Sequence, residues 1–156
     1  MVDVPADPHT ILTKVENING ELTNIPYREA VGSLMFAAVV SRPDIAYSVG
    51  VASRYLNAPS KTHWNAVKRI IRYLKSTSEL GIYYSREDKL QLSGFSDSDY
   101  ASDEDTRKST TGYIFKLSNG DVTWSSKRQQ AVTLSTTEAE YVAACQATKE
   151  AIWIRR

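Results

Sequence analysis

The chain has 156 residues, the size of one typical domain, and is long enough to bury a hydrophobic core. Its 42% hydrophobic and 24% charged residues exclude disordered and collagen-like proteins, and its net charge of +1 does not indicate any class of charged partner. The single cysteine, Cys145, excludes an internal disulfide and a cysteine-based zinc site, and we expect it to be a small core residue.

Targeting signals are not evident in the sequence. The first twenty residues lack the basic start and the continuous apolar run of a secretory signal. The longest apolar stretch, residues 30–40, is too short to cross a bilayer, which requires about 20 residues. We therefore expect an intracellular protein, cytoplasmic or nuclear, with no membrane partner.

The N-terminal half is predicted to be an arm followed by three helices. Residues 1–25 contain prolines, asparagines and a glycine without periodicity, which is typical of an extended arm or linker. Apolar residues then recur at helical spacing in three segments, the first after Pro26, the second up to Leu56 and the third after a capping Ser60. The apolar stripe of the third helix is predicted to be Trp64, Val67, Ile71 and Leu74.

From about residue 80 the pattern changes to that of strands. Strands are predicted at residues 82–84, 90–95, 111–117 and 122–126, with a hairpin turn signalled by Asn119-Gly120. Ser135, with Glu138 three residues later, predicts a capping box at the start of a final helix that runs to the last residue. The predicted fold class is α+β: three helices, then an antiparallel three-strand meander with one packed helix.

Four basic side chains of the third helix fall within about 60° of one another around the helix axis. They are Lys61, Lys68, Arg72 and Lys75. Such a row favours binding to the phosphate backbone of a nucleic acid, because each contact releases counterions. The alternative is an ordinary solvated face of an amphipathic helix, which taken alone is the commoner explanation.

Carboxylates gather at residues 97–105 and again on the final helix. A calcium loop is excluded because Ala101 and Ser102 stand where such a loop needs an acid or amide and a glycine. The segment is then either a polar turn that caps its own backbone or, at Asp97, a strand-end ligand for a divalent ion. Glu138 and Glu140 lie about 200° apart on a helix, so one of them at most faces the sheet. Glu140 is expected to do so, on one face with Ala144, Ala147 and Ala151.

A series of motifs covers nearly the whole chain. They run from Tyr27 to Met35, from Ser41 to Tyr47, from His63-Trp64 through Arg72-Tyr73-Leu74-Lys75, from Gly94 to Tyr100, from Asp105 to Tyr113, from Trp124 to Lys127 and from Leu134 to Tyr141. In these motifs and in their order the chain resembles copia-type (Ty1/copia) retrotransposon Pol polyproteins.

The resemblance implies a domain organisation and a chemistry. Residues 1–25 are an arm or linker, residues 26–85 resemble the thumb-side end of a reverse transcriptase, and residues 86–156 resemble the first half of a ribonuclease H domain. That domain hydrolyses the RNA strand of an RNA/DNA hybrid with two Mg²⁺ ions held by carboxylates. By resemblance Asp97 matches the first metal-binding aspartate and Glu140 the helix glutamate, and Glu138 is the less favoured alternative.

The family's third catalytic aspartate follows the final helix, and its polymerase palm precedes residue 1. We therefore expect a fragment that binds Mg²⁺ weakly and is inactive alone, with a nucleic acid such as an RNA/DNA hybrid and the remainder of Pol as partners. Three alternatives remain open: a non-catalytic nucleic-acid-binding protein, an adapted transposon-derived protein with an effector-like role, and a gene relic.

Overall fold

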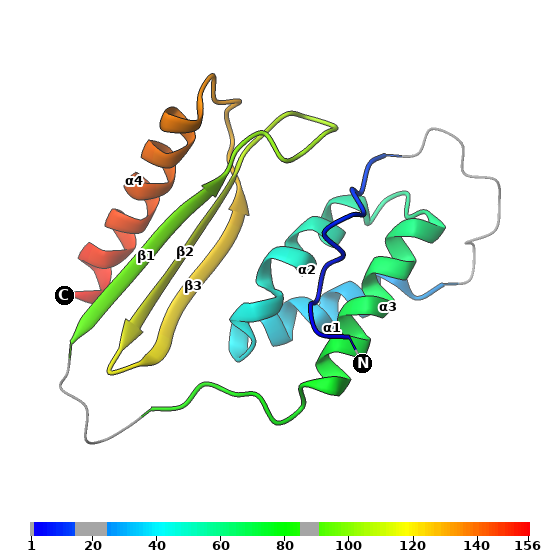
Figure 1. Ribbon diagram of the computed structural model, residues 1–156, viewed down its shortest axis with the longest axis horizontal. Coiled ribbons are helices and arrows are strands. Elements are labelled where there is room, and N and C mark those ends of the chain that lie inside the picture. Colours follow the sequence, from blue (N-terminus) through cyan, green and yellow to red (C-terminus); the bar gives the residue numbers. More distant parts are fainter. Residues whose placement is uncertain (1, 15–24, 85–90) are drawn as a thin grey trace. The chain divides into compact units, whose positions relative to one another are not determined.

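The computed structural model describes residues 2–14, 25–84 and 91–156. The chain divides into two compact units, Met1–Gly81 and Ile82–Arg156. The order of helices, antiparallel sheet and final helix confirms the α+β fold class (Figure 1). Among the described residues there is no helix with the length and apolar character needed to span a bilayer.

The first unit is a helical unit with one core. It contains α1 (Tyr27–Val40), the 3-10 turn η1 (Pro43–Ile45), α2 (Ala46–Ala52), the 3-10 turn η2 (Ser53–Tyr55) and α3 (Lys61–Ser76). The core consists of Tyr27, Val31, Leu34, Ala38, Ile45, Val49, Ala52, Val67, Ile70 and Tyr73. The predicted second helix is therefore a short α-helix between two 3-10 turns.

The predicted apolar stripe of α3 is partly wrong. Ile70 and Tyr73 are buried, whereas Ile71 is 44% exposed. Apolar residues occupy both position 70 and position 71, so helical spacing alone does not choose between them. Packing against α1 and α2 makes that choice.

A polar network joins the connection after α1 to the end of α3. Arg42 donates to both carboxylate oxygens of Asp44, at 3.0 and 2.7 Å, and also to the backbone oxygen and the hydroxyl of Thr77. Tyr73 donates its hydroxyl to Asp44 at 2.8 Å. Burial disfavours the charged carboxylate, but the hydrogen bonds from Arg42 and Tyr73 outweigh that effect and lower the pKa of Asp44. This network fixes the position of η1 against the last turn of α3.

The predicted cap of α3 is confirmed and has a histidine as its second member. Ser60 Oγ accepts from the backbone N–H of His63, and His63 Nδ1 accepts from the N–H of Ser60 at 2.8 Å. The His63 ring is buried, stacks on Tyr55 with 3.9 Å between ring centroids, and lies with Nε2 3.1 Å from the Thr13 carbonyl oxygen. Because Nδ1 accepts, Nε2 carries the proton and donates it to that oxygen.

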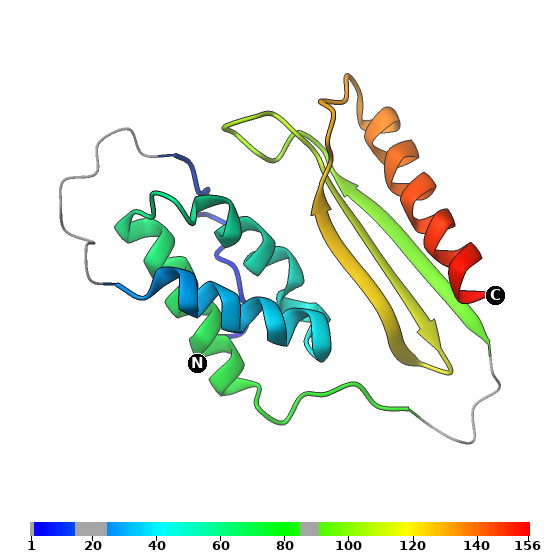
Figure 2. The ribbon, with the colours of Figure 1, turned by 180° about the vertical axis from the view of Figure 1, so that it is seen from behind.

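The second unit is a three-stranded antiparallel sheet in the order β1-β2-β3, with β1 (Leu92–Asp99), β2 (Thr110–Leu117) and β3 (Gly120–Arg128). Helix α4 (Thr136–Ile154) lies on one face, over β1 and β2 (Figure 2). Within the described part of the chain, β1 pairs only with β2 and therefore forms an edge of the sheet.

The hairpin between β2 and β3 turns one residue earlier than the sequence signal predicts. Ser118 and Asn119 occupy the two turn positions with φ of 49° and 67°, and Leu117 pairs with Gly120. A Cβ at Gly120 would lie 2.2 Å from the ring of Tyr84, whose hydroxyl donates to the Asp121 carbonyl at 2.6 Å. The strand predicted at residues 82–84 is absent. Tyr84 instead packs on this turn.

The buried stripe of α4 also differs from the prediction. Ala139, Ala143 and Ala147 are buried, whereas Ala144 and Cys145 are exposed. The core position predicted for Cys145 is therefore wrong. Alanines at both 143 and 144 again leave the choice to packing, and small side chains at the contact allow the helix to approach the sheet closely.

We expect His63→Ala to lower the free energy of unfolding by about 2 to 3 kcal/mol, because it removes the buried ring and the acceptor of the Ser60 N–H in the cap of α3. His9→Ala is the matched control, since His9 is exposed. Urea unfolding followed by circular dichroism measures both changes, and equal stability of the two variants would contradict the structural role of His63.

We expect Ala143→Leu to destabilise the chain by about 1 to 3 kcal/mol, because the larger side chain overpacks the contact between α4 and the sheet. Ala144→Leu, at the exposed neighbouring position, should change the unfolding midpoint little. Thermal unfolding of the two variants tests the orientation of α4, and the reverse ranking would restore the orientation predicted from sequence.

Candidate functional site

The two faces of the sheet can be assigned from its register. Ser98 pairs with Thr111, and Asp97 pairs with Gly112. Thr123 pairs with Phe115 and donates to Glu150 of α4 at 2.8 Å, so the face that carries Thr111 and Phe115 is the one that α4 covers. Because side chains alternate along a strand, Ser98 points to this face and Asp97 to the opposite one.

Gly94 allows β1 to lie under a buried aromatic ring. Gly94 pairs with Phe115, and a Cβ at Gly94 would lie 2.2 Å from Cε1 of that ring. Phe115 is buried on the face of the sheet that α4 covers. A side chain at residue 94, three residues before Asp97, would therefore clash with the Phe115 ring.

Glu140 extends from α4 to the edge strand. Its Oε1 accepts from the backbone N–H of Ser98 at 3.3 Å, one residue after Asp97. Ala139, not Glu140, faces the sheet directly, and Glu140 is an exposed residue at the border of the contact. The structure therefore brings Glu140 to the strand residue next to Asp97.

Glu138 is engaged elsewhere. Ser135 Oγ accepts from the Glu138 N–H at 3.1 Å, and the Glu138 carboxylate accepts from the N–H of Leu134 at 2.6 Å. The predicted capping box is thus formed with one change, since the carboxylate binds the residue before the cap rather than Ser135 itself. The Glu138 carboxylate stabilises the beginning of α4.

Gln129, which the sequence patterns did not single out, fixes the first turn of α4 to the sheet. Its buried Nε2 donates to Thr111 Oγ1 and to the Ala139 carbonyl oxygen, each at 3.0 Å. Its backbone N–H donates to the Ser109 carbonyl at 2.8 Å. A glutamine after a strand is typical of a surface position, so no sequence signal indicated this role.

The acidic segment after β1 is arranged around a buried aspartate. Asp103 accepts from the N–H of Asp105 and from the hydroxyl of Thr106, and it forms an ion pair with Arg128. This is the arrangement that the polar-turn alternative predicts. Arg128, at the end of β3, was not predicted to take part.

The chemistry of Asp97 and Glu140 suits Mg²⁺, because both supply carboxylate oxygens in exposed positions. Among residues 2–14, 25–84 and 91–156, however, no group of three or more His, Cys, Asp and Glu side chains could hold a metal ion. The described residues thus offer two ligands from opposite sides of β1. They do not form a complete metal site.

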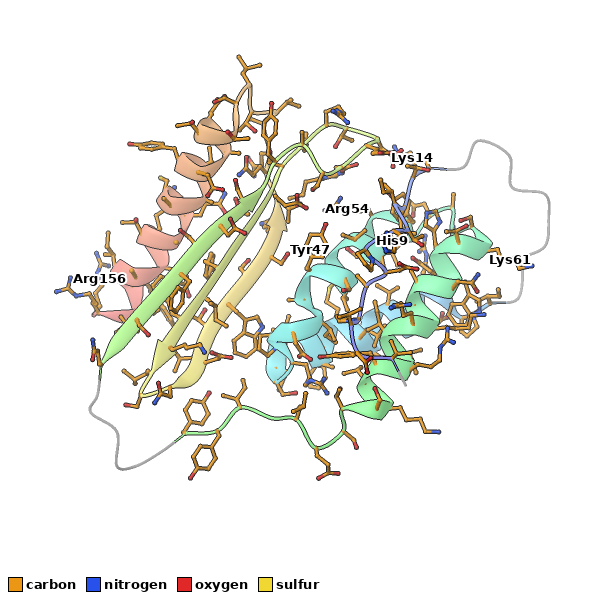
Figure 3. All side chains as sticks on the ribbon, viewed as in Figure 1. His9, Lys14, Tyr47, Arg54, Lys61 and Arg156 are labelled. Carbon is orange, nitrogen blue, oxygen red and sulfur yellow. The ribbon has the colours of Figure 1, made fainter. Side chains whose placement is uncertain are left out.

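The four basic residues predicted to contact nucleic acid are all exposed on α3, and Figure 3 shows Lys61 at its beginning. Arg72 Nε donates to the Lys68 carbonyl within the helix at 3.2 Å. No ion pair involves any of the four within the described residues. Their charges therefore face solvent. A contact with phosphate requires this arrangement, but an ordinary solvated helix face has it too.

Comparison with known proteins gives close relatives. No protein-family model matches the chain, and no solved structure matches it. The chain is 51% identical over 144 residues to the retrovirus-related Pol polyprotein from transposon TNT 1-94 of Nicotiana tabacum. The matched residues are 92% of the chain and 11% of that polyprotein. It is 44% identical over 128 residues to the retrovirus-related Pol polyprotein from transposon RE2 of Arabidopsis thaliana, and this match covers 82% of the chain and 9% of the polyprotein.

A shorter relative matches along almost its whole length. The secreted RxLR effector protein 161 of Plasmopara viticola is 49% identical over 133 residues, which are 85% of the chain and 94% of the effector. The chain thus spans about a tenth of the two Pol polyproteins and nearly all of the effector. On this similarity along most of its length, the chain belongs to the family of copia-type retrotransposon Pol polyproteins.

Proposed function

We propose that the chain supplies the Asp97–Glu140 pair of a ribonuclease H-like site that cleaves the RNA strand of an RNA/DNA hybrid, and that further Pol residues complete this site. The observation that carries the proposal is the hydrogen bond between Glu140 and the N–H of Ser98, the residue after Asp97. This contact distinguishes Glu140 from Glu138, whose carboxylate is used in the cap of α4.

Each element of the second unit has a role in this function. Strand β1 presents Asp97, and α4, fixed through Gln129, presents Glu140 to the same strand. Asp97, on the face of β1 away from α4, and Glu140, at the backbone N–H of the next residue, would each supply a carboxylate to the completed site. The Mg²⁺ that such a site holds would activate water and stabilise the leaving oxygen. Since Mg²⁺ requires a near-ideal octahedron of oxygens, two carboxylates alone would bind it weakly.

The exposed basic residues of α3 would contribute affinity rather than chemistry. Lys61, Lys68, Arg72 and Lys75 present positive charge to solvent, which supports contact with the phosphate backbone. Such contacts carry no sequence information, as expected for binding to a hybrid of any sequence.

A non-catalytic, effector-like role is the second candidate, because the chain matches 94% of the length of a secreted effector. The two candidates differ in where the chain acts. Immunodetection of the chain in the culture filtrate of its source organism, with a cytoplasmic enzyme as the control for lysis, would favour the effector-like role. Retention in the cells would favour the Pol function.

We expect a protein of these 156 residues not to cleave a labelled RNA/DNA hybrid in Mg²⁺, because it contains two carboxylates of an incomplete metal site. A fusion that continues after Arg156 with the following segment of the TNT 1-94 Pol polyprotein should cleave the hybrid. In the fusion Asp97→Asn and Glu140→Gln should each abolish cleavage, whereas Glu138→Gln, the matched control, should retain most of it.

Two results would contradict the proposal. Cleavage by the 156-residue protein that Asp97→Asn abolishes would show a complete site. A folded but inactive fusion, or one in which Glu138→Gln is as damaging as Glu140→Gln, would reject the assigned pair.

We expect binding of the hybrid to weaken steeply as the salt concentration rises. Replacing both Lys68 and Arg72 with Ala should flatten the slope of log K against log salt by about one to two, because each phosphate contact contributes roughly 0.9 to this slope on duplex DNA. Fluorescence anisotropy with a labelled hybrid at several KCl concentrations measures the slope.

The control for this measurement is the double variant Arg155→Ala, Arg156→Ala, which removes the same charge from the end of the chain. It should leave the slope unchanged. Equal slopes for all three proteins would mean that the basic face of α3 is only solvated.

A further inference from the structure

The first fourteen residues contain a segment that docks on the helical unit. Residues 2–14, the blue segment in Figure 1, have neither helix nor strand. Four of their carbonyl oxygens nevertheless accept hydrogen bonds from side chains of η2 and α3. Ser76 Oγ donates to the Val2 oxygen at 3.0 Å, and Arg69 Nε donates to the Val4 oxygen at 3.3 Å. At the other end, Tyr55 donates to Leu12 at 2.6 Å and His63 Nε2 to Thr13 at 3.1 Å.

The contacts of this segment are made mainly through its main chain. None of its residues is buried, and Val4 and Ile11 are 46% and 60% exposed. Val2 alone packs partly against the core of the unit. A segment that is held by four carbonyl groups and buries none of its side chains fully is recognised by its backbone shape more than by its side chains.

A local turn sets the shape of the segment. The carboxylate of Asp7 accepts from the His9 N–H at 3.0 Å and from the Thr10 hydroxyl at 3.1 Å, and the Thr10 N–H donates to the Asp7 carbonyl oxygen. Pro5 and Pro8 restrict the backbone on either side of Asp7, which lowers the entropy lost on docking. The turn spaces the two pairs of bound carbonyls so that both reach their donors.

Two of the four receiving side chains, Tyr55 and His63, are held by contacts within the helical unit. His63 is held by the cap of α3 and stacks on Tyr55, so both donors at the Leu12–Thr13 end are positioned by contacts within the helical unit. Arg69 and Ser76 lie on α3 two helical turns apart. This surface would persist if residues 2–14 were to leave it.

We propose that the surface formed by Tyr55, His63, Arg69 and Ser76 is a binding site for an extended peptide main chain, and that residues 2–14 occupy it as a separable intramolecular ligand. The proposal goes beyond the proposed function, since it involves neither Asp97 nor Glu140. Covalent linkage raises the effective concentration of such a segment to the order of millimolar for short tethers, so a docked state can persist although the free peptide binds weakly.

The test uses the full chain with a protease recognition sequence inserted within residues 15–24. After cutting, a fluorescent peptide of residues 2–14 is added, and its anisotropy is measured as the protein is titrated. The cut protein should bind the peptide at least tenfold more tightly than the uncut protein, in which the tethered segment competes. Circular dichroism before and after cutting verifies that the helical unit remains folded.

Variants separate main-chain recognition from general adhesion. In the cut protein Tyr55→Phe, which keeps the ring on His63, and Arg69→Gln should each weaken peptide binding at least threefold. Arg72→Gln, on the same helix but without a contact to residues 2–14, should not change it. A peptide with Ile11→Ala should bind as before. A peptide with Asp7→Ala should bind more weakly because it lacks the turn and the attraction between the Asp7 carboxylate and Arg69.

Several results would overturn the proposal. The first is that the folded, cut protein does not bind the peptide up to millimolar concentration. The second is that Arg69→Gln and Arg72→Gln have equal effects. The third is that the helical circular dichroism signal is lost on cutting, which would make residues 2–14 part of the fold. Each outcome leaves the hybrid-cleavage experiment unaffected, so the two proposals fail independently.

Discussion

The close contact between α4 and the sheet determines what the second unit can present. Buried alanines at 139, 143 and 147 let the helix lie near β1 and β2, because the helix itself contributes no large side chain at these positions. This short distance is what allows the side chain of Glu140, at the border of the contact, to reach the backbone of Ser98. Bulkier residues on that face would raise the helix and carry Glu140 away from the strand that bears Asp97.

Several residues of the motifs that resemble the Pol family serve the architecture of the first unit. Arg42 and Asp44 connect η1 to Tyr73 and to Thr77 at the end of α3, and no feature of the network indicates chemistry. His63 combines a helix cap, an aromatic stack and a contact to the N-terminal segment. The chain is similar both to long Pol polyproteins and to an effector of which it covers 94%.

Element types were predictable from local signals. The change from helical to strand periodicity near residue 80 placed the boundary between helices and sheet, and Ser60 and Ser135 marked the beginnings of α3 and α4 because capping depends on neighbouring residues alone. The choice of Glu140 over Glu138 came from the resemblance together with helix geometry. Gln129 and Arg128 gave no local signal, since their partners lie on other elements.

The sequence by itself determined the order of the elements, their periods and their caps, because each depends on residues within a few positions of one another. Tertiary packing alone decided between adjacent residues of equal character: Ile70 over Ile71, and Ala143 over Ala144. It also decided the turn at Ser118 and Asn119, where the ring of Tyr84 occupies the space above Gly120. These choices depend on which surfaces meet, and residues distant in the sequence supply those surfaces.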